Sequence, residues 1–339
     1  MSVSGRTIER GRFAPSPTGE LHLGNARTAL LAWLSARSRG ARFTMRIEDL
    51  DRPRCRPGLA EKQLEELAWL GLDWDEGPES APPHTEAGPH GPYRQSQRGP
   101  LYDRAIEQLR EGGHVYDCFC SRAQIRAAAD ALHSNDRADA TSEASAPHGP
   151  QDDGPRYPGT CANLTAAEVA TRRKSRAPAL RLRVPHEPIS FDDAIAGPQQ
   201  FDPATEVGDF ILRRADGVHA YQLAVVVDDA AMEITEVVRG ADLLASTARQ
   251  MLLYRMLGLR IPSWAHVPLL FGPPGIDGQP QRLSKRAGAE TLSTMRARGD
   301  DPRTIVAQLA RSSSLVGDEI AACTPAELLP RFALARLSR

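Results

Sequence analysis

The pattern of apolar and polar positions along the first fifty residues predicts a strand, a loop, a helix and a second strand. A short strand ends at residues 12–14, and residues 15–19 form a loop because two prolines and a glycine fit no regular element. Apolar residues then recur with helical spacing from about Gly24 until Gly40 ends the helix. Residues 43–51 give an alternating strand that ends in acidic side chains. In open α/β sheets such strand ends face the ligand crevice, so the pattern predicts a binding site here.

Downstream of residue 57 the pattern predicts further helices and strands, separated by one long segment without periodicity. Residues 130–155 are rich in Ala, Ser, Asp, Pro, Gly and His, and we interpret them as a flexible insertion. About fifty residues follow Arg286, mostly with a helical pattern, and we find no internal repeat. The predicted helices are 58–70, 100–111 and about 243–256, the predicted strands are 233–238 and 266–271, and a hairpin is predicted over 210–223 around Asp216-Gly217.

Composition and charge argue against a membrane span and leave nucleic-acid binding open. The chain has 339 residues, of which 41% are apolar and 25% charged, and its formal net charge is −1. No apolar run approaches the roughly 18 residues that suggest a membrane span, and the polar N-terminus holds no signal-peptide core. We therefore expect a cytoplasmic protein. A charge near zero neither suggests nor forbids a polyanionic partner, because one local basic face is enough to bind it.

The first candidate site is the segment that joins the predicted loop to the predicted helix, with His22, Gly24 and Asn25 at its end. Unpaired N–H groups and the positive end of the helix dipole suit a phosphate at such a helix start. His22 can donate a hydrogen bond to a phosphate oxygen, and Gly24 leaves room for a flat base or ribose. By itself H-x-G-x is a short pattern, and a helix capped after a proline-rich turn is the alternative.

The second candidate site is the basic string Arg282-Leu-Ser-Lys285-Arg286, which follows a glycine-rich loop. Two or three cations on a mobile loop can close over a triphosphate and offset the charge that develops at the reacting phosphorus. A solvated basic loop with no bound partner is the alternative for this string taken alone.

Together the two motifs, with α/β pattern around them, resemble those of the class I aminoacyl-tRNA synthetases. The longer strings at 12–25 and 46–51 are similar to the glutamyl branch of that family, and the resemblance runs from about residue 10 to about residue 291. Asn25 stands where the family motif has His, and Arg282 replaces the commoner Lys. The resemblance implies that His22 and Lys285 are catalytic and that ATP, with Mg²⁺, binds to His22, Gly24, Asn25, Arg282, Leu283, Ser284, Lys285 and Arg286.

Residues at predicted strand ends could bind an amino acid that carries two carboxylates. Glu48 could hold the ammonium group, while Arg12 and Arg239 could fork onto the carboxylates and Tyr221 could add a hydroxyl. Ordinary strand-end polar residues are the alternative, since such loops are normally polar. The resemblance to the glutamyl branch implies a glutamate site made of Arg12, Phe13, Ala14, Pro15, Ser16, Glu48, Tyr221 and Arg239.

Three of the five cysteines fall around one segment and suggest a metal site. An odd count without a signal peptide does not indicate a disulfide framework, and we expect Cys55 and Cys323 to be plain thiols. Cys118 and Cys120 form a C-x-C pair and Cys161 follows, a spacing that favours zinc in a reducing compartment. Three sulfur ligands are one short of a closed tetrahedron, and three half-buried free thiols are the alternative.

A shortened subfamily of the glutamyl enzymes resembles this chain more closely. About fifty residues after the basic string are too few for an anticodon-reading domain with its own core. In that subfamily a tyrosine placed like Tyr157 is the fourth ligand of a structural zinc; His114, His133 and His148 are candidate substitutes here. Its members activate L-glutamate without tRNA and attach it to the cyclopentene-diol of queuosine, a modified base in the anticodon stem-loop of tRNA(Asp). No obligate protein partner is evident.

The resemblance implies an α/β fold with a Rossmann-type nucleotide-binding catalytic core and an inserted zinc-binding subdomain. We expect residues 9–112 and 201–291 to form the two halves of the core and 113–200 the insertion. Residues 292–339 are expected to form a short helical C-terminal region without an anticodon-binding domain. The alternatives are a compact glutamyl-tRNA synthetase that charges a tRNA 3′ end, a non-catalytic RNA-binding paralogue, or a nucleotidyltransferase acting on a small molecule.

A basic stretch at 172–176, with Arg181 and Arg183 following, could track RNA phosphates. A solvated helix face is an equally good interpretation, because runs of charge usually have that role.

Overall fold

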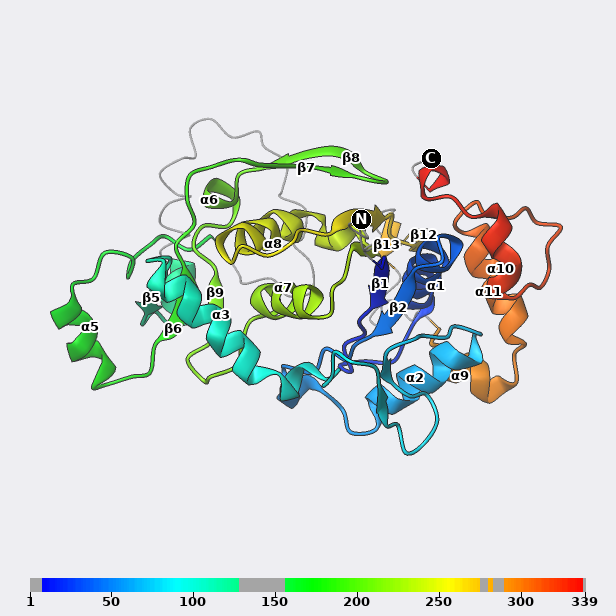
Figure 1. Ribbon diagram of the computed structural model, residues 1–339, viewed down its shortest axis with the longest axis horizontal. Coiled ribbons are helices and arrows are strands. Elements are labelled where there is room, and N and C mark those ends of the chain that lie inside the picture. The colour runs from blue at the N-terminus through cyan, green and yellow to red at the C-terminus, as the bar shows by residue number, and fades with distance from the viewer. Residues whose placement is uncertain (1–7, 128–155, 275–279, 283–289, 338–339) are drawn as a thin grey trace, which may run out of the picture.

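The computed structural model describes residues 8–127, 156–274, 280–282 and 290–337, which adopt a mixed α/β fold (Figure 1). The insertion predicted at 130–155 and residues Leu283 to Arg286 of the basic string lie outside the described residues. No described helix is both long and apolar enough to cross a membrane. Elements not detailed below are α2 (Leu59–Trp69), α6 (Pro203–Glu206), β3 (Gly77–Pro78), β4 (Glu86–Ala87), β12 (Phe271–Pro274) and β13 (Pro280–Arg282).

The N-terminal strand–helix–strand unit is confirmed. Strand β1 (Arg10–Phe13) pairs in parallel with β2 (Arg42–Met45), and α1 (Leu23–Ser38) forms the connection between them. On its other side β1 lies beside β10 (Glu236–Gly240), which in turn pairs in parallel with β11 (Ser263–Val267). Parallel strands order their carboxyl ends along one edge, which places the loop after β1 and the acidic residues after β2 together.

Two predicted strands lie at shifted positions. The strand expected at 233–238 runs over Glu236–Gly240, because Glu233 has a positive φ of 56° and lies in the turn that ends the preceding helix. The strand expected at 266–271 is β11, which begins at Ser263 and ends at Val267, before Pro268. A proline has no N–H to offer the sheet, so the parallel pairing stops there.

The predicted hairpin over 210–223 is only partly correct. Strand β9 (Ile211–Arg213) and a turn at Gly217, where φ is 87°, lead back to a single bridge between Arg213 and His219. The chain then enters helix α7 (Tyr221–Ala231). Three consecutive valines in this segment favour a strand by local propensity. Burial of most of α7 against α3 (Gly99–Glu111) and α8 (Leu244–Met256) overrides that preference.

A second, antiparallel sheet lies beside the parallel strands, at the left of Figure 1. It consists of β5 (Val115–Cys118), β6 (Ala179–Leu182) and β9, and α5 (Ala166–Arg173) lies at its outer side. The hairpin of β7 (Ile189–Asp193) and β8 (Gly197–Phe201) instead joins the parallel strands, since Asp193 pairs with Trp264 of β11. Strands β5 and β6 therefore belong to the antiparallel sheet, whereas β7 and β8, which follow them in sequence, belong to the other sheet.

The C-terminal region is helical as predicted and packs onto α1. Its helices are α9 (Leu292–Arg298), α10 (Pro302–Arg311) and α11 (Pro325–Leu328). Apolar side chains such as Ile305 and Leu309 share one core with Leu30 and Leu34 of α1. Helix α1 is consequently buried around most of its circumference, between the parallel strands and the C-terminal helices.

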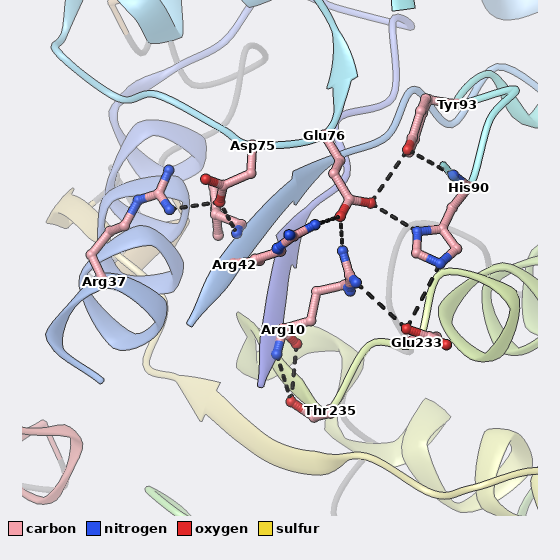
Figure 2. Close-up of polar contacts among 10 residues, drawn as sticks. Arg10, Arg37, Arg42, Asp75, Glu76, His90, Tyr93, Glu233 and Thr235 are labelled. Atoms are coloured by element: carbon pink, nitrogen blue, oxygen red, sulfur yellow. Dashed lines mark hydrogen bonds and ion pairs between the residues drawn. The ribbon is translucent and has the colours of Figure 1, made fainter. Parts of the chain in front are cut away.

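A buried polar cluster ties the long connection after β2 to the start of β1 (Figure 2). The carboxylate of Glu76 accepts from Arg10, from His90 Nδ1 at 2.8 Å and from the Tyr93 hydroxyl at 3.3 Å. Arg10 also reaches Glu233, 3.5 Å away. Because Glu76 is 1% exposed and fully bonded, the cluster fixes the chain leading to α3 against the sheet.

Candidate active site

A cavity of about 690 Å³ opens at the carboxyl ends of β1 and β2 and the start of α7. Its wall is formed by the loop after β1, the residues after β2, the start of α7 and parts of the second sheet. Predicted site residues in this wall are Pro15, Ser16, His22, Asn25, Glu48 and Tyr221. Two segments that are more than 150 residues apart in sequence thus meet at the position that the strand ends predicted.

His22 stands at the N-terminal end of α1 and caps it. Its Nδ1 accepts from the Gly24 N–H at 3.1 Å, while the His22 N–H donates to Asn25 Oδ1 at 3.3 Å. A β-carbon at Gly24 would lie 2.9 Å from the imidazole ring, so the missing side chain makes room for His22. The motif therefore contains its own helix cap and also presents the imidazole to the cavity.

Both flanks of the basic string are described, although the side chains of Arg282 to Arg286 are not. Upstream, β13 ends at Arg282 after pairing with β12. Downstream, Thr291 forms a bridge with His22, and the Leu292 N–H donates to the Leu21 carbonyl at 2.9 Å. The chain thus returns from the basic string directly to the first motif.

Glu48 is held in place from both sides. Its N–H donates to the Pro15 carbonyl at 2.9 Å, and its own carbonyl accepts from Ser16 Oγ at 2.9 Å. Arg46 donates to the Glu48 carboxylate at 3.1 Å. Burial raises the pKa of Glu48, and the Arg46 guanidinium opposes that rise. Arg46 therefore compensates part of the negative charge of Glu48, and a substrate ammonium group would compensate the rest.

Buried carboxylates that the sequence analysis missed organise the cations behind this wall. Asp229 on α7 accepts from Arg46 at 2.6 Å and lies 3.5 Å from Arg12 Nε. Its neighbour Asp228 accepts from Gln95 at 2.8 Å. Burial raises the pKa of Asp229, but the two arginines outweigh it and leave that pKa lowered. A helical reading of 221–231 would have found both aspartates, since they lie two turns after Tyr221.

Arg12 and Arg239 lie behind the cavity wall, each about 5% exposed or less. Phe13, Ala14 and Gly24 are likewise absent from the wall itself. The charges of Arg12, Glu48 and Arg239 all act on Tyr221, whose pKa is raised to about 12, mainly by burial. The structure therefore gathers the predicted cations, carboxylate and phenol in one place, with the cations at the base.

The predicted metal ligands converge as well. The Sγ atoms of Cys118, Cys120 and Cys161 lie within 4.8 Å of one another, and the Tyr157 hydroxyl is 3.3 Å from Cys118 and 3.6 Å from Cys120. Ligands about 2.3 Å from a tetrahedral zinc are about 3.8 Å apart, so the four groups fit such an ion. His114 is not in this group, and His133 and His148 lie outside the described residues.

The cluster borders the cavity through Arg181. That side chain lines the cavity, and its guanidinium carbon lies 3.8 Å from the centre of the Tyr157 ring. Much of the basic stretch at 172–176 folds back onto the same cluster: Arg173 pairs with Asp117 at 2.6 Å and Arg176 donates to the Phe119 carbonyl at 2.7 Å. Arg173 and Arg176 therefore stabilise the segment that carries Cys118 and Cys120.

Comparison with known proteins gives a consistent result. Residues 9–339 match the family described as tRNA synthetases class I (E and Q), catalytic domain. Relatives named Glutamyl-Q tRNA(Asp) synthetase include one from Symbiobacterium thermophilum, 53% identical over 97% of this chain and 94% of its own length. Another, from Nitratidesulfovibrio vulgaris, is 46% identical over 91% of this chain and 87% of its own.

The fold resembles solved structures of the same kind. The crystal structure of glutamate-tRNA synthetase from Elizabethkingia anophelis aligns with a TM-score of 0.78 and 30% identity. The alignment covers 97% of this chain and 66% of that protein, so this chain spans about two thirds of its length.

Proposed function

Since this chain belongs to the class I tRNA synthetases (E and Q), we propose that it activates L-glutamate with ATP and transfers it to queuosine in tRNA(Asp). A glutamate carboxylate oxygen attacks the α-phosphorus of ATP, and pyrophosphate leaves. A hydroxyl of the queuosine cyclopentene-diol then attacks the activated carbonyl, an ester forms, AMP leaves and the hydroxyl proton is released. The first step needs no tRNA.

The cavity at the strand ends is the observation that carries this proposal. His22 and Asn25 start α1 on one side of it, where the helix terminus suits the phosphates of ATP. Glu48 and Tyr221 line the other part, with Arg12 and Arg239 behind them to bind the glutamate carboxylates. Glutamate would then lie next to the nucleotide, with the ammonium group of glutamate bound to Glu48. Lys285 and the neighbouring cations would neutralise the phosphates, together with Mg²⁺.

The division of the chain follows from the same family. We assign 9–112 and 201–291 to a Rossmann-type nucleotide-binding core, 113–200 to an inserted subdomain and 292–339 to a C-terminal helical region. Supporting this, the parallel strands come from both halves of the core, and all three clustered cysteines belong to the inserted segment, with Cys118 at the end of β5. Strands β7 and β9 cross the division by pairing with the other part.

The anticodon stem-loop would enter over the cavity mouth. Arginines from separate segments line it, and such cations suit RNA phosphates. They are Arg54, Arg122, Arg126 and Arg214. This surface supports the RNA partner better than the stretch at 172–176, whose arginines are engaged with the cysteine segment.

Glutamate-dependent exchange of label between pyrophosphate and ATP tests the first step. We expect exchange with purified protein, ATP and glutamate alone, because the amino-acid site is complete in the described residues. Aspartate and glutamine should be poor substrates, since either would leave a buried arginine without its carboxylate. Exchange that appears only after tRNA is added would contradict the proposal and favour a compact glutamyl-tRNA synthetase.

We further propose one structural zinc ion per chain, bound by Cys118, Cys120, Cys161 and Tyr157. When bound, zinc would pin the second sheet beside the cavity and take no part in the reaction. Elemental analysis of metal-replete protein should give about one zinc, and Cys161→Ser should lose it. Cys55→Ser and Cys323→Ser are matched controls that should keep it. Metal-replete protein without zinc would disprove this assignment.

A further inference from the structure

Arg239 is held by a chain of buried polar groups that runs away from the cavity. Its Nε donates to His266 Nε2 at 3.0 Å, and NH1 donates to Gln250 Oε1 at 2.8 Å. NH2 donates to Thr247 Oγ1 at 2.8 Å and to the Leu243 carbonyl at 3.2 Å. These contacts occupy four of the five guanidinium hydrogens, which leaves one NH1 hydrogen to reach a substrate carboxylate.

His266 connects Arg239 to a carboxylate from another hairpin. Its Nδ1 lies 2.6 Å from Oδ2 of Asp193, at the end of β7. The β7–β8 hairpin lies over α8 in Figure 1, and its strand β7 pairs with β11, which carries His266. All three side chains are less than 5% exposed. A buried histidine between a carboxylate and a guanidinium is restricted to one tautomer, because one ring nitrogen faces an acceptor and the other faces a donor.

The surrounding bonds decide which tautomer that is. Asp193 Oδ1 accepts the N–H groups of Ile195 at 3.0 Å, Ala196 at 2.8 Å and His266 at 3.1 Å, so the carboxylate cannot rotate. Oδ2 is left to accept from Nδ1–H, and the lone pair of Nε2 then accepts from Arg239. Burial lowers the pKa of His266 to about 4 against the opposing effect of Asp193, so the ring is neutral at neutral pH.

We infer that Asp193 and His266 are positioning residues, which fix the His266 tautomer so that Arg239 presents its remaining N–H to a substrate carboxylate. This inference rests on the proposed function in one respect, the contact between Arg239 and glutamate. It assigns a role to the β7–β8 hairpin, which brings Asp193 to the back of the site without touching substrate.

The substitution Asp193→Asn tests the inference without changing volume. Because Oδ1 keeps its three N–H partners, the new NH₂ group must face His266 Nδ1 and donate to it. The ring then takes the Nε2–H tautomer, and that N–H faces both Arg239 Nε–H and Thr247 Oγ1, which is 3.2 Å away, so that Nε2 no longer accepts from Arg239. We expect the KM for glutamate in pyrophosphate exchange to rise on the order of 10–100-fold, with the KM for ATP unchanged. Nitrogen-15 spectra of histidine-labelled protein should show the proton moving from Nδ1 to Nε2 of His266.

Two further variants keep the test decisive if Asp193→Asn folds poorly. His266→Gln retains an amide oxygen that can accept from Arg239 and should stay within a few-fold of the parent KM. His266→Leu has no acceptor and should show the full rise. A purely structural role would affect the two alike, and that result would overturn the inference. Asp75→Asn is the matched control, because Asp75 also accepts a backbone N–H, from Phe43 at 2.6 Å, near the amino end of β2 and not at the strand ends that border the cavity.

Arg239→Lys separates this inference from the proposed function. If it raises the KM for glutamate while Asp193→Asn and His266→Leu leave the KM unchanged, the positioning role is wrong and the glutamate site stands. If Arg239→Lys itself leaves the KM unchanged, Arg239 does not bind glutamate, and both the site assignment and the inference fall.

Discussion

Transfer of glutamate to tRNA(Asp) is expected to occur only when that tRNA carries queuosine. The reaction needs a hydroxyl close to the activated carbonyl, and the cyclopentene-diol supplies two neighbouring hydroxyls at the anticodon. The tRNA(Asp) of cells unable to make queuosine lacks this cyclopentene-diol. Without a nucleophile the expected loss is complete to background, the largest effect that we predict. The measurement is incorporation of labelled glutamate into tRNA(Asp) from the two kinds of cell.

The position of the label provides the control. After nuclease digestion the glutamate should remain with the anticodon fragment and be absent from the 3′-terminal fragment. tRNA(Glu), which offers only a 3′ ribose diol, should remain unlabelled. Equal labelling of tRNA(Asp) with and without queuosine, or efficient charging of tRNA(Glu), would defeat the acceptor assignment. Glutamate activation would be untouched by that result, because the first step is tested separately.

Loss of His22 or Lys285 should slow glutamate activation by about 10²–10³-fold while leaving the KM for glutamate nearly unchanged. Each side chain would donate a hydrogen bond to the negative charge that develops on the phosphates during the reaction. The carboxylate of bound glutamate gains no such charge before the reaction, so glutamate binding should be nearly unaffected. For His22 the structure adds a complication, because the side chain also caps α1. His22→Ala therefore removes two functions, and its effect on stability must be separated from its effect on rate.

His22→Asn makes that separation. Asparagine is a good N-cap residue, so the helix should keep most of its stability, whereas the shorter side chain cannot reach as far into the cavity. We expect a normal unfolding transition and a rate close to that of His22→Ala. Arg255→Ala removes a cation at the exposed end of α8 and serves as the control. Unchanged turnover in His22→Asn and Lys285→Ala would show that the nucleotide binds elsewhere.

Local sequence determined the first fold unit and the motifs within it. The strand, loop and helix at the N-terminus follow from short-range signals: two prolines and a glycine, then helical spacing from Gly24. His22, Gly24 and Asn25 form their hydrogen bonds within one helix start, so their arrangement depends on neighbours in sequence. Glu48 was placed correctly at a strand end for the same reason. Contiguous motifs of this kind also carried the family resemblance.

Tertiary structure decided what depends on distant partners. Residues 221–223 were expected in a hairpin strand, yet they begin α7, because packing between α3 and α8 outweighs the local preference of the neighbouring valines for a strand. The same helix brings Asp228 to Gln95 and Asp229 to Arg46.

The chain of Asp193, His266 and Arg239 shows the same limit most clearly. Its members come from β7, β11 and β10, and no spacing in the sequence connects them. Their alignment arises because Asp193 pairs across the sheet with Trp264, two residues before His266, which places the carboxylate beside the His266 N–H and imidazole. Sequence could name Arg239 as a cation for carboxylates. Only the packed sheet could supply the acceptor that orients it, since an unpaired buried guanidinium would be too costly to hold in place.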